Sequence, residues 1–332
     1  NTWKEPNYIF IEGNRLISSI IVFFGPYFMP VLFVLSGIST KSALEKRTNK
    51  EYLIERVKRL FIPFLFGTIV LVPIMTYLAD KFNYSYDGGF LQHYVVFFTK
   101  YTDLTGADGG FSLGQFWFLL YLFIISVVSV GIIAALKRIL VKPEKAIPFW
   151  TVLALGFPLP LLKELLSIGG KSLVEYTYLF LLGYYVFADE KIVNKAEKNS
   201  LLLLGAGLIA SILNVYLFIW SEVELLFLNT IAKYLSEWIM VIAFIGLAKR
   251  YLNFKNKASD YMNKRSFLFY IYHFIWVVGF VGNKAVALFM GTVVLSYLMT
   301  FICCEISIRI PVLCFLTGTK FFRNGEKRRK GK

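Results

Sequence analysis

The chain has 332 residues, of which 57% are hydrophobic and 18% aromatic, whereas only 17% are charged. A soluble domain has about 25% charged residues and could not bury this much apolar surface, so a soluble enzyme and a disordered chain are both excluded. The net charge of +15 does not indicate a nucleic-acid partner, because the basic residues lie between long apolar runs. The composition predicts an all-α, polytopic integral membrane helix bundle.

Nine segments are long and apolar enough, or nearly so, to cross a membrane, since about 20 helical residues span a hydrocarbon layer of about 30 Å. They lie at 16–39, 60–79, 115–136, 149–166, 173–188, 200–220, 226–248, 267–283 and 285–308. The fourth and fifth are short, and Pro158 and Pro160 interrupt the fourth. Broken or re-entrant helices packed inside protein are expected there.

Lysine and arginine are distributed unevenly between the two sides of this arrangement. Of the 36 basic residues, 28 lie in alternate segments, at 40–59, 137–148, 189–199, 249–266 and from 309 onward. The positive-inside rule then predicts a multi-pass protein of the cell membrane with a cytoplasmic C-terminus. Nine crossings place Asn1 outside, so we expect one further span upstream, ten in the full-length protein. Residues 1–332 would form a single membrane domain that lacks its first span; the alternative is that one short segment does not cross.

The chain contains two histidines. His273 lies about 10 Å into the layer, counted from the edge of its span near Ser266 at 1.5 Å per residue. It is either a base, proton carrier or ligand anchor facing a polar tunnel, or a neutral side chain that ties two helices together. His93 lies in the long outer loop 80–114, either as an interfacial residue or in contact with an external substrate. Residues 90–98 of that loop are expected to lie on the membrane surface.

Arg56 and Arg59 directly precede the second span. Two arginines one helical turn apart could clamp the phosphates of an acyl-CoA or a nucleotide, because guanidinium groups bind phosphate with two parallel hydrogen bonds. The alternative is ordinary positive-inside flanking charge. Gln115 and Trp117 open the third span, where a tryptophan is usually an interfacial anchor.

Two pairs of opposite charge stand four residues apart on predicted helices: Lys233 with Glu237, and Glu305 with Arg309. Each pair is expected to be structural, because helical residues at this spacing are neighbours and pairing lowers the cost of burial. Sequence motifs for a phosphate loop, a zinc protease and paired-cysteine metal sites are lacking, so no metal is expected.

Four motifs follow one another along the chain: MPVLFVLSG at 29–37, RxxR at 56–59 with LFIPFLFG at 60–67, QFWFL at 115–119, and YHF at 272–274. In this order the chain resembles the integral-membrane acyltransferase type 3 family, especially the branch that includes the succinyltransferase of osmoregulated periplasmic glucans. The resemblance implies about ten spans and transfer of acetyl or succinyl groups from cytoplasmic acyl-CoA to hydroxyls of extracytoplasmic carbohydrates. Its implied partners are therefore acyl-CoA, a carbohydrate acceptor and membrane lipid, with no nucleic acid and no metal.

The resemblance also suggests residue roles. Arg56 and Arg59 match the family's arginine pair, which implies binding of the acyl donor. Trp117 matches the tryptophan of the family's WFL motif, and with Gln115 and Tyr272 it is placed at the tunnel or acceptor side. The family's first span carries a basic residue and, ten positions later, a histidine thought to be catalytic; neither histidine here fits that pattern. The main catalytic histidine is thus expected upstream of residue 1, with His273 as the candidate within the chain. Gln115 stands near a position where many members have histidine, which points to a different acceptor.

These features predict a bacterial-type membrane O-acyltransferase of the cell envelope. Two other classes stay open. A transporter or flippase could use Lys233, Glu237 and His273 as a substrate or proton path. A structural component of an envelope-polymer assembly would carry out no acyl transfer at all.

Overall fold

The computed structural model describes residues 8–9, 15–102, 104, 106–139, 148–223, 225–281 and 289–319, with side chains except at 137–139, 281 and 289–290. Within these ranges six helices are long and apolar enough to cross a membrane, and three more are shorter but apolar. The long ones are Arg15–Leu44, Asn49–Tyr84, Gly114–Leu136, Ser200–Trp220, Leu226–Tyr251 and Gly291–Arg309; the short ones are Phe149–Leu162, Leu173–Phe187 and Ser266–Phe280. All nine coincide with predicted segments, so the all-α polytopic bundle is confirmed. The predicted residues 282–288, the loop at 140–147 and the tail from 320 lie outside the described residues.

The helices belong to two compact units. Among the described residues, unit 1 comprises those within 15–52 and 125–254, and unit 2 comprises those within 8–9, 53–124 and 255–319. The boundary passes through two continuous helices, α2 (Asn49–Arg56) and α6 (Trp117–Ile139).

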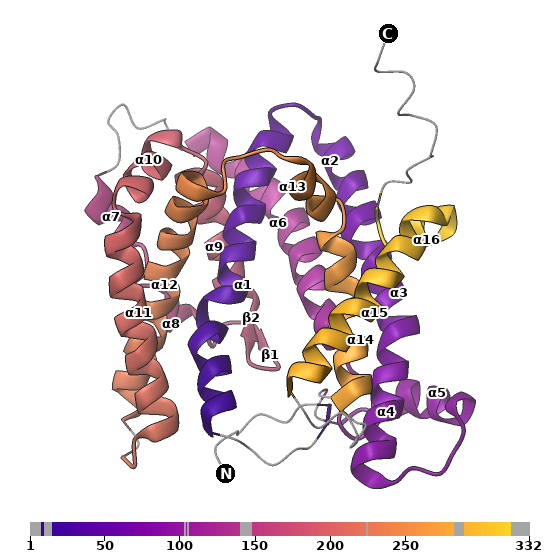
Figure 1. The fold of residues 1–332 in the computed structure, drawn as a ribbon. Coiled ribbons are helices and arrows are strands. Elements are labelled where there is room, and N and C mark those ends of the chain that lie inside the picture. Colours follow the sequence, from indigo (N-terminus) through magenta and orange to yellow (C-terminus); the bar gives the residue numbers. More distant parts are fainter. Residues whose placement is uncertain are drawn as a thin grey trace. The chain divides into compact units, whose positions relative to one another are not determined.

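Unit 1 is built around α1 and a helical hairpin of α11 and α12, which lie side by side (Figure 1). Besides its parts of α2 and α6 it contains α1 (Arg15–Leu44), α7 (Phe149–Ala154), α8 (Leu159–Leu162), β1 (Ser167–Ile168), β2 (Lys171–Ser172), α9 (Leu173–Leu182), η4 (Gly183–Phe187), α10 (Glu190–Lys198), α11 (Ser200–Val215), η5 (Tyr216–Trp220) and α12 (Leu226–Tyr251). Many large apolar side chains of α11 point outward, such as Leu202 and Ile209, as expected of a helix in lipid.

Two glycines allow α1 to pack directly on the α9–η4 helix. A Cβ atom on Gly37 would lie 2.0 Å from the Phe180 carbonyl oxygen, and one on Gly183 would lie 2.1 Å from the Val34 carbonyl oxygen. The two backbones therefore touch at a distance that any side chain would prevent. Lipid tails give little hydrophobic drive for helix association, so close backbone packing between small residues takes its place.

The fourth predicted span is broken, as its prolines indicate. It consists of α7 and α8 with turns between them, and three carbonyl groups near the break are bound by side chains. Trp238 Nε1 donates to the Val152 oxygen at 3.0 Å and to the Leu153 oxygen at 3.1 Å, and the Tyr178 hydroxyl donates to the Leu155 oxygen at 2.8 Å. The break is tolerable at membrane depth because protein groups take the hydrogen bonds that water cannot supply.

A two-residue hairpin follows the broken helix. Strands β1 and β2 pair antiparallel, with Ser167 opposite Ser172. Gly169 and Gly170 form the turn with φ of +57° and +73°, values that favour glycine. Ser172 then caps α9, because its hydroxyl oxygen accepts from the Glu175 backbone N–H at 3.1 Å.

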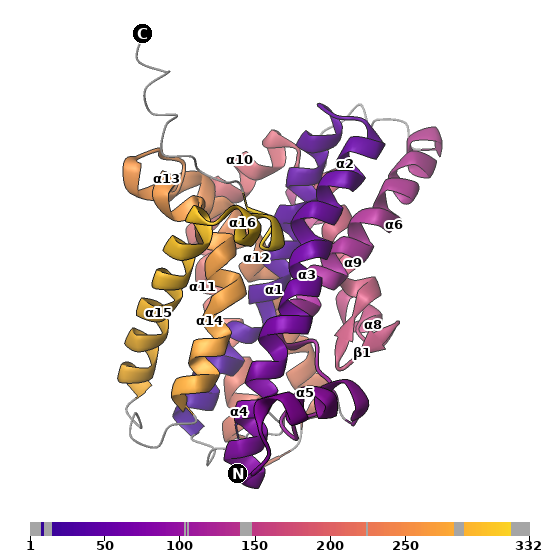
Figure 2. The same cartoon turned by 90° about the vertical axis from the view of Figure 1, so that its right-hand side faces the viewer.

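Unit 2 contains the long helix that carries the arginine pair, and α14 and α15 lie side by side in it (Figure 2). Its elements, besides its parts of α2 and α6, are η1 (Val57–Phe61), α3 (Ile62–Phe66), η2 (Gly67–Leu71), α4 (Val72–Tyr84), α5 (Phe90–Thr99), η3 (Gly114–Phe116), α13 (Lys257–Asn263), α14 (Ser266–Val281), α15 (Phe289–Arg309) and α16 (Pro311–Leu316). Both η1 and η2 are π-helical turns inside one continuous helix. Such turns are frequent at functional sites. Residues 90–98, which are predicted to lie on the membrane surface, are helical and form most of α5.

Candidate functional site

The predicted site residues come from three distant stretches of sequence, and all of them belong to unit 2. They are Arg56, Arg59, Gln115, Trp117, Tyr272 and His273. Unit 2 therefore brings together the motifs that carry the proposed chemistry.

Gln115 is joined to α14 by two hydrogen bonds. Its Nε2 donates to the Ile271 carbonyl oxygen at 3.3 Å, and the Tyr270 hydroxyl donates to the Gln115 carbonyl oxygen. The 3₁₀ turn η3 places Gln115 here, and it begins at Gly114, whose φ is +52°. The side-chain oxygen of Gln115 is buried and has no hydrogen-bond partner in the described part of the chain. An amide oxygen can accept hydrogen bonds, for example from a hydroxyl group.

Aromatic rings next to Gln115 fix this junction. The Phe116 ring fills the space above Gly67, where a Cβ atom would lie 2.3 Å from the ring. Phe118 meets the Tyr270 ring edge-on, with centroids 5.8 Å apart. Trp117 is half-buried and meets the Tyr121 ring edge-on at 5.3 Å. The QFWFL motif therefore packs α6 on both α14 and the arginine-bearing helix.

His273 lies one helical turn beyond Tyr270 and is half-buried. Its Nδ1 is 3.0 Å from the Phe269 carbonyl oxygen and 2.9 Å from the Tyr270 carbonyl oxygen. Because carbonyl oxygens only accept, Nδ1 carries the hydrogen and Nε2 keeps the lone pair of a neutral imidazole. This is the tautomer required of a general base that acts through Nε2.

Tyr272, by contrast, points toward α15. It is buried, and its hydroxyl oxygen accepts from Ser307 Oγ at 2.9 Å. The contact joins α14 to α15 at the level of the YHF motif. Tyr270 is the tyrosine that reaches Gln115, and sequence reasoning missed it because motif spacing does not show which of two alternate tyrosines faces which helix.

The arginine pair spans the junction of α2 and η1. Arg56 is half-buried, whereas Arg59 is exposed and forms an ion pair with Glu55 at 3.1 Å. Gly318, at φ +63°, closes on this turn, since a Cβ atom there would lie 2.9 Å from the Lys58 carbonyl oxygen. Arg59 and Gly67 are eight residues apart, about 12 Å along a helix. Along this helix the arginines are therefore about 12 Å from the place where the Phe116 ring packs beside Gln115.

A second basic cluster lies in the same unit. Arg265 Nε is 2.5 Å from Glu305 Oε1, and Arg309 is 3.3 Å from Glu305 Oε2. The Tyr261 hydroxyl also donates to Glu305, at 2.6 Å. The predicted Glu305–Arg309 pair is thus confirmed, and Arg265 is a nearer partner that the helical spacing alone does not indicate.

The predicted Lys233–Glu237 pair is wrong. Lys233 is exposed and lies over the Tyr234 ring at 5.1 Å, and no ion pair joins it to Glu237 in the described structure. Glu237 is buried, and its carboxyl group is close enough to that of Glu175 of α9 to interact with it. The helical spacing is correct, but in the described structure Lys233 stays beyond ion-pair distance of Glu237, and the two carboxyl groups belong to unit 1.

His93 is completely buried in unit 2 rather than interfacial. The rings of Tyr77 and Tyr86 meet it edge-on, and Asp80 Oδ2 is 3.7 Å from Nε2, too far for a hydrogen bond. Neither ring nitrogen has a hydrogen-bond partner in the described residues. Burial, with a smaller effect of Lys100, lowers the pKa of His93 to about 4, so it is neutral near pH 7.

Comparison with known proteins decides the family. The model of the acyltransferase domain, acyltransferase type 3, matches residues 2–308, which include all four motifs and every predicted site residue. The protein belongs to the acyltransferase type 3 family. It is an acyltransferase and, by its apolar helices, a multi-pass membrane protein. No curated protein and no solved structure matches the chain.

Proposed function

We propose that this acyltransferase moves an acetyl or succinyl group from cytoplasmic acyl-CoA to a hydroxyl group of an extracytoplasmic carbohydrate in the cell membrane. The observation that carries the proposal is the set of functional groups that unit 2 contains. One compact unit holds an arginine pair suited to phosphates, a histidine with an available Nε2, and a buried amide oxygen able to accept a hydroxyl.

In this proposal the donor's phosphates lie at Arg56 and Arg59. A base takes the proton of the acceptor hydroxyl, whose oxygen adds to the thioester carbonyl carbon. The C–S bond breaks as the ester C–O bond forms, and the thiolate leaves and is protonated as free CoA. His273 is the candidate base among the described residues, and Gln115 Oε1 orients the hydroxyl. The further catalytic histidine expected upstream of residue 1 stays a prediction.

The proposal is tested with purified protein in detergent, radiolabelled acetyl-CoA or succinyl-CoA, and an envelope carbohydrate extract. We expect label in the carbohydrate and an equal amount of free CoA thiol. A transporter would release no thiol, because it breaks no thioester bond. Acceptor-dependent thiol release therefore separates the enzyme from the transporter and from the structural component.

The donor site is tested by Arg59→Ala. We expect at least a tenfold higher KM for acyl-CoA, because a charge-assisted hydrogen bond to phosphate contributes about 1.5–3 kcal/mol. Lys50→Ala is the matched control, since Lys50 is an exposed cation on the adjoining helix α2. Equal affinity for acyl-CoA in Arg59→Ala and wild type would show that the arginines do not bind the donor phosphates. Their role would then be that of ordinary positive-inside flanking charge.

A further inference from the structure

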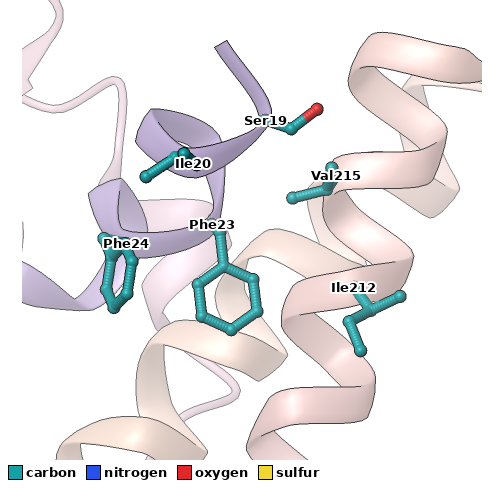
Figure 3. Close-up of a pocket in the computed structure, with 6 residues that line it drawn as sticks. All are labelled: Ser19, Ile20, Phe23, Phe24, Ile212 and Val215. Atoms are coloured by element: carbon teal, nitrogen blue, oxygen red, sulfur yellow. The ribbon is translucent and has the colours of Figure 1, made fainter. Parts of the chain in front are cut away.

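A shallow crevice lies between α1 and α11 in unit 1 (Figure 3). Its volume is about 270 Å³, close to the lower limit of ligand pockets, and apolar atoms make up its accessible walls. Phe23 projects from α1 toward α11, and Val215 projects from the other wall (Figure 3). The lining residues are Ser19, Ile20, Phe23, Phe24, Ile212 and Val215.

The crevice lies between two candidate membrane spans, and several of its lining side chains are exposed in the described structure. Ile20 is 54% exposed, Phe24 53% and Ile212 61%. Exposed side chains in a membrane span meet hydrocarbon rather than water, and water gains no hydrogen bonds in an apolar crevice. The occupant must therefore be an apolar chain.

Hydrogen bonds connect the two walls of the crevice and fix the distance between them. Asn214 Nδ2 donates to the Val22 carbonyl oxygen at 3.3 Å, and Asn229 Nδ2 donates to the Asn214 carbonyl oxygen at 3.3 Å. Trp220 Nε1 donates to Ser19 Oγ at 3.0 Å. Because bonds at both ends connect α1 with the α11–η5 helix, the crevice is part of the packed unit.

A cation stands at one end of the crevice. Arg15 lies one helical turn before Ser19, and its guanidinium group is 5.6 Å from the centroid of the Trp220 ring. In the described structure Arg15 forms no ion pair, so its charge is not offset by a carboxylate. A tryptophan with a basic residue is typical of the headgroup level of a membrane.

We propose that this crevice is a phospholipid site, with one acyl chain between α1 and α11 and the lipid phosphate against Arg15. The apolar walls select the chain, and the guanidinium group supplies the complementary charge for the phosphate. A second protein copy or another helix could fill the apolar crevice but would not supply an anion to Arg15. This site is distinct from the predicted acyl-transfer residues, all of which belong to unit 2.

The test uses the purified protein in vesicles containing a phosphatidylglycerol whose acyl chain carries a photoreactive diazirine. After irradiation, peptide mass spectrometry should find cross-links concentrated at Phe23, Phe24 and Ile212. Ile212→Trp fills the crevice and should lower this labelling at least fivefold. Ile209→Trp is the matched control, because Ile209 is 70% exposed on the same helix and does not line the crevice. Size-exclusion profiles check folding, and Val215→Phe is the second filling variant.

The headgroup contact is tested with Arg15→Gln and with a diacylglycerol that carries the same diazirine but no phosphate. Each should reduce labelling at least threefold, whereas Arg250→Gln should not. Even labelling along α1 and α11 that neither filling variant lowers would mean ordinary surrounding lipid and overturn the proposal. Equal labelling by diacylglycerol, or protein–protein cross-links at Phe23, would also overturn it. No readout here depends on acyl transfer, so failure of this site and failure of the proposed function are distinguishable.

Discussion

His273 is either a catalytic base or a structural residue, and its two ring nitrogens bear on this choice differently. Its Nδ1 is engaged by backbone carbonyl oxygens of its own helix, so any chemistry must use Nε2. If Nε2 is the base, His273→Gln should lower kcat by about 100-fold or more with little change in the donor KM. If His273 is only structural, the variant protein should have a lower melting temperature but an unchanged kcat. Steady-state kinetics and thermal unfolding of the same preparation separate the two roles.

His93 makes stability depend on pH. Its pKa is lowered to about 4 in the folded protein by burial, whereas in the unfolded chain it is close to 6.5. The unfolded state then binds more protons below pH 6.5, so the free energy of unfolding should fall as the pH drops from about 6.5 to 4, by at most about 3 kcal/mol. Thermal melting across this range should show the loss in wild type, with a smaller slope in His93→Gln. Parallel slopes in the two proteins would contradict this assignment.

At the scale of elements, glycine contacts set the packing of α1. Gly37→Ala should destabilise the protein by about 3 kcal/mol or more, because its Cβ atom would collide with the backbone at Phe180. Gly25→Ala in the same helix meets nothing within 4 Å and should be neutral or stabilising by up to about 1 kcal/mol. The melting temperature and the monodisperse yield in detergent measure both. Similar losses in the two variants would show that α1 tolerates no alanine, for reasons other than this contact.

Much of the helical layout was predictable, because hydropathy and length decide which segments are helices in lipid. Pro158 and Pro160 also indicated the break between α7 and α8. The partners of individual side chains were not predictable: Trp238 binding the freed carbonyl groups, Tyr270 reaching Gln115, and Glu175 facing Glu237 all depend on tertiary packing. Spacing along one helix shows which residues are neighbours, but not which neighbour lies on the next helix.

At the scale of the whole molecule, the number of crossings is open to direct test. Five predicted spans separate Asp87 from Lys257, and both residues are exposed. If all five cross, Asp87→Cys in intact cells should react with a membrane-impermeant thiol reagent and Lys257→Cys only after lysis. Wild type, with Cys304 and Cys314 buried and Cys303 half-buried, measures the background. Labelling of both variants in intact cells would mean that one short segment does not cross.

The two π-helical turns between Arg56 and α4 also affect how this helix can be engineered. Each π turn accommodates one extra residue, which rotates everything downstream by about 100° relative to an uninterrupted α-helix. The first turn, η1, lies between Arg56 and Gly67, the residue that receives the Phe116 ring, whereas η2 begins at Gly67 and lies between it and α4. A chimera that borrows this stretch from another member must carry both insertions: without the first, Arg56 and Gly67 would face different directions, and without the second, Gly67 and α4 would.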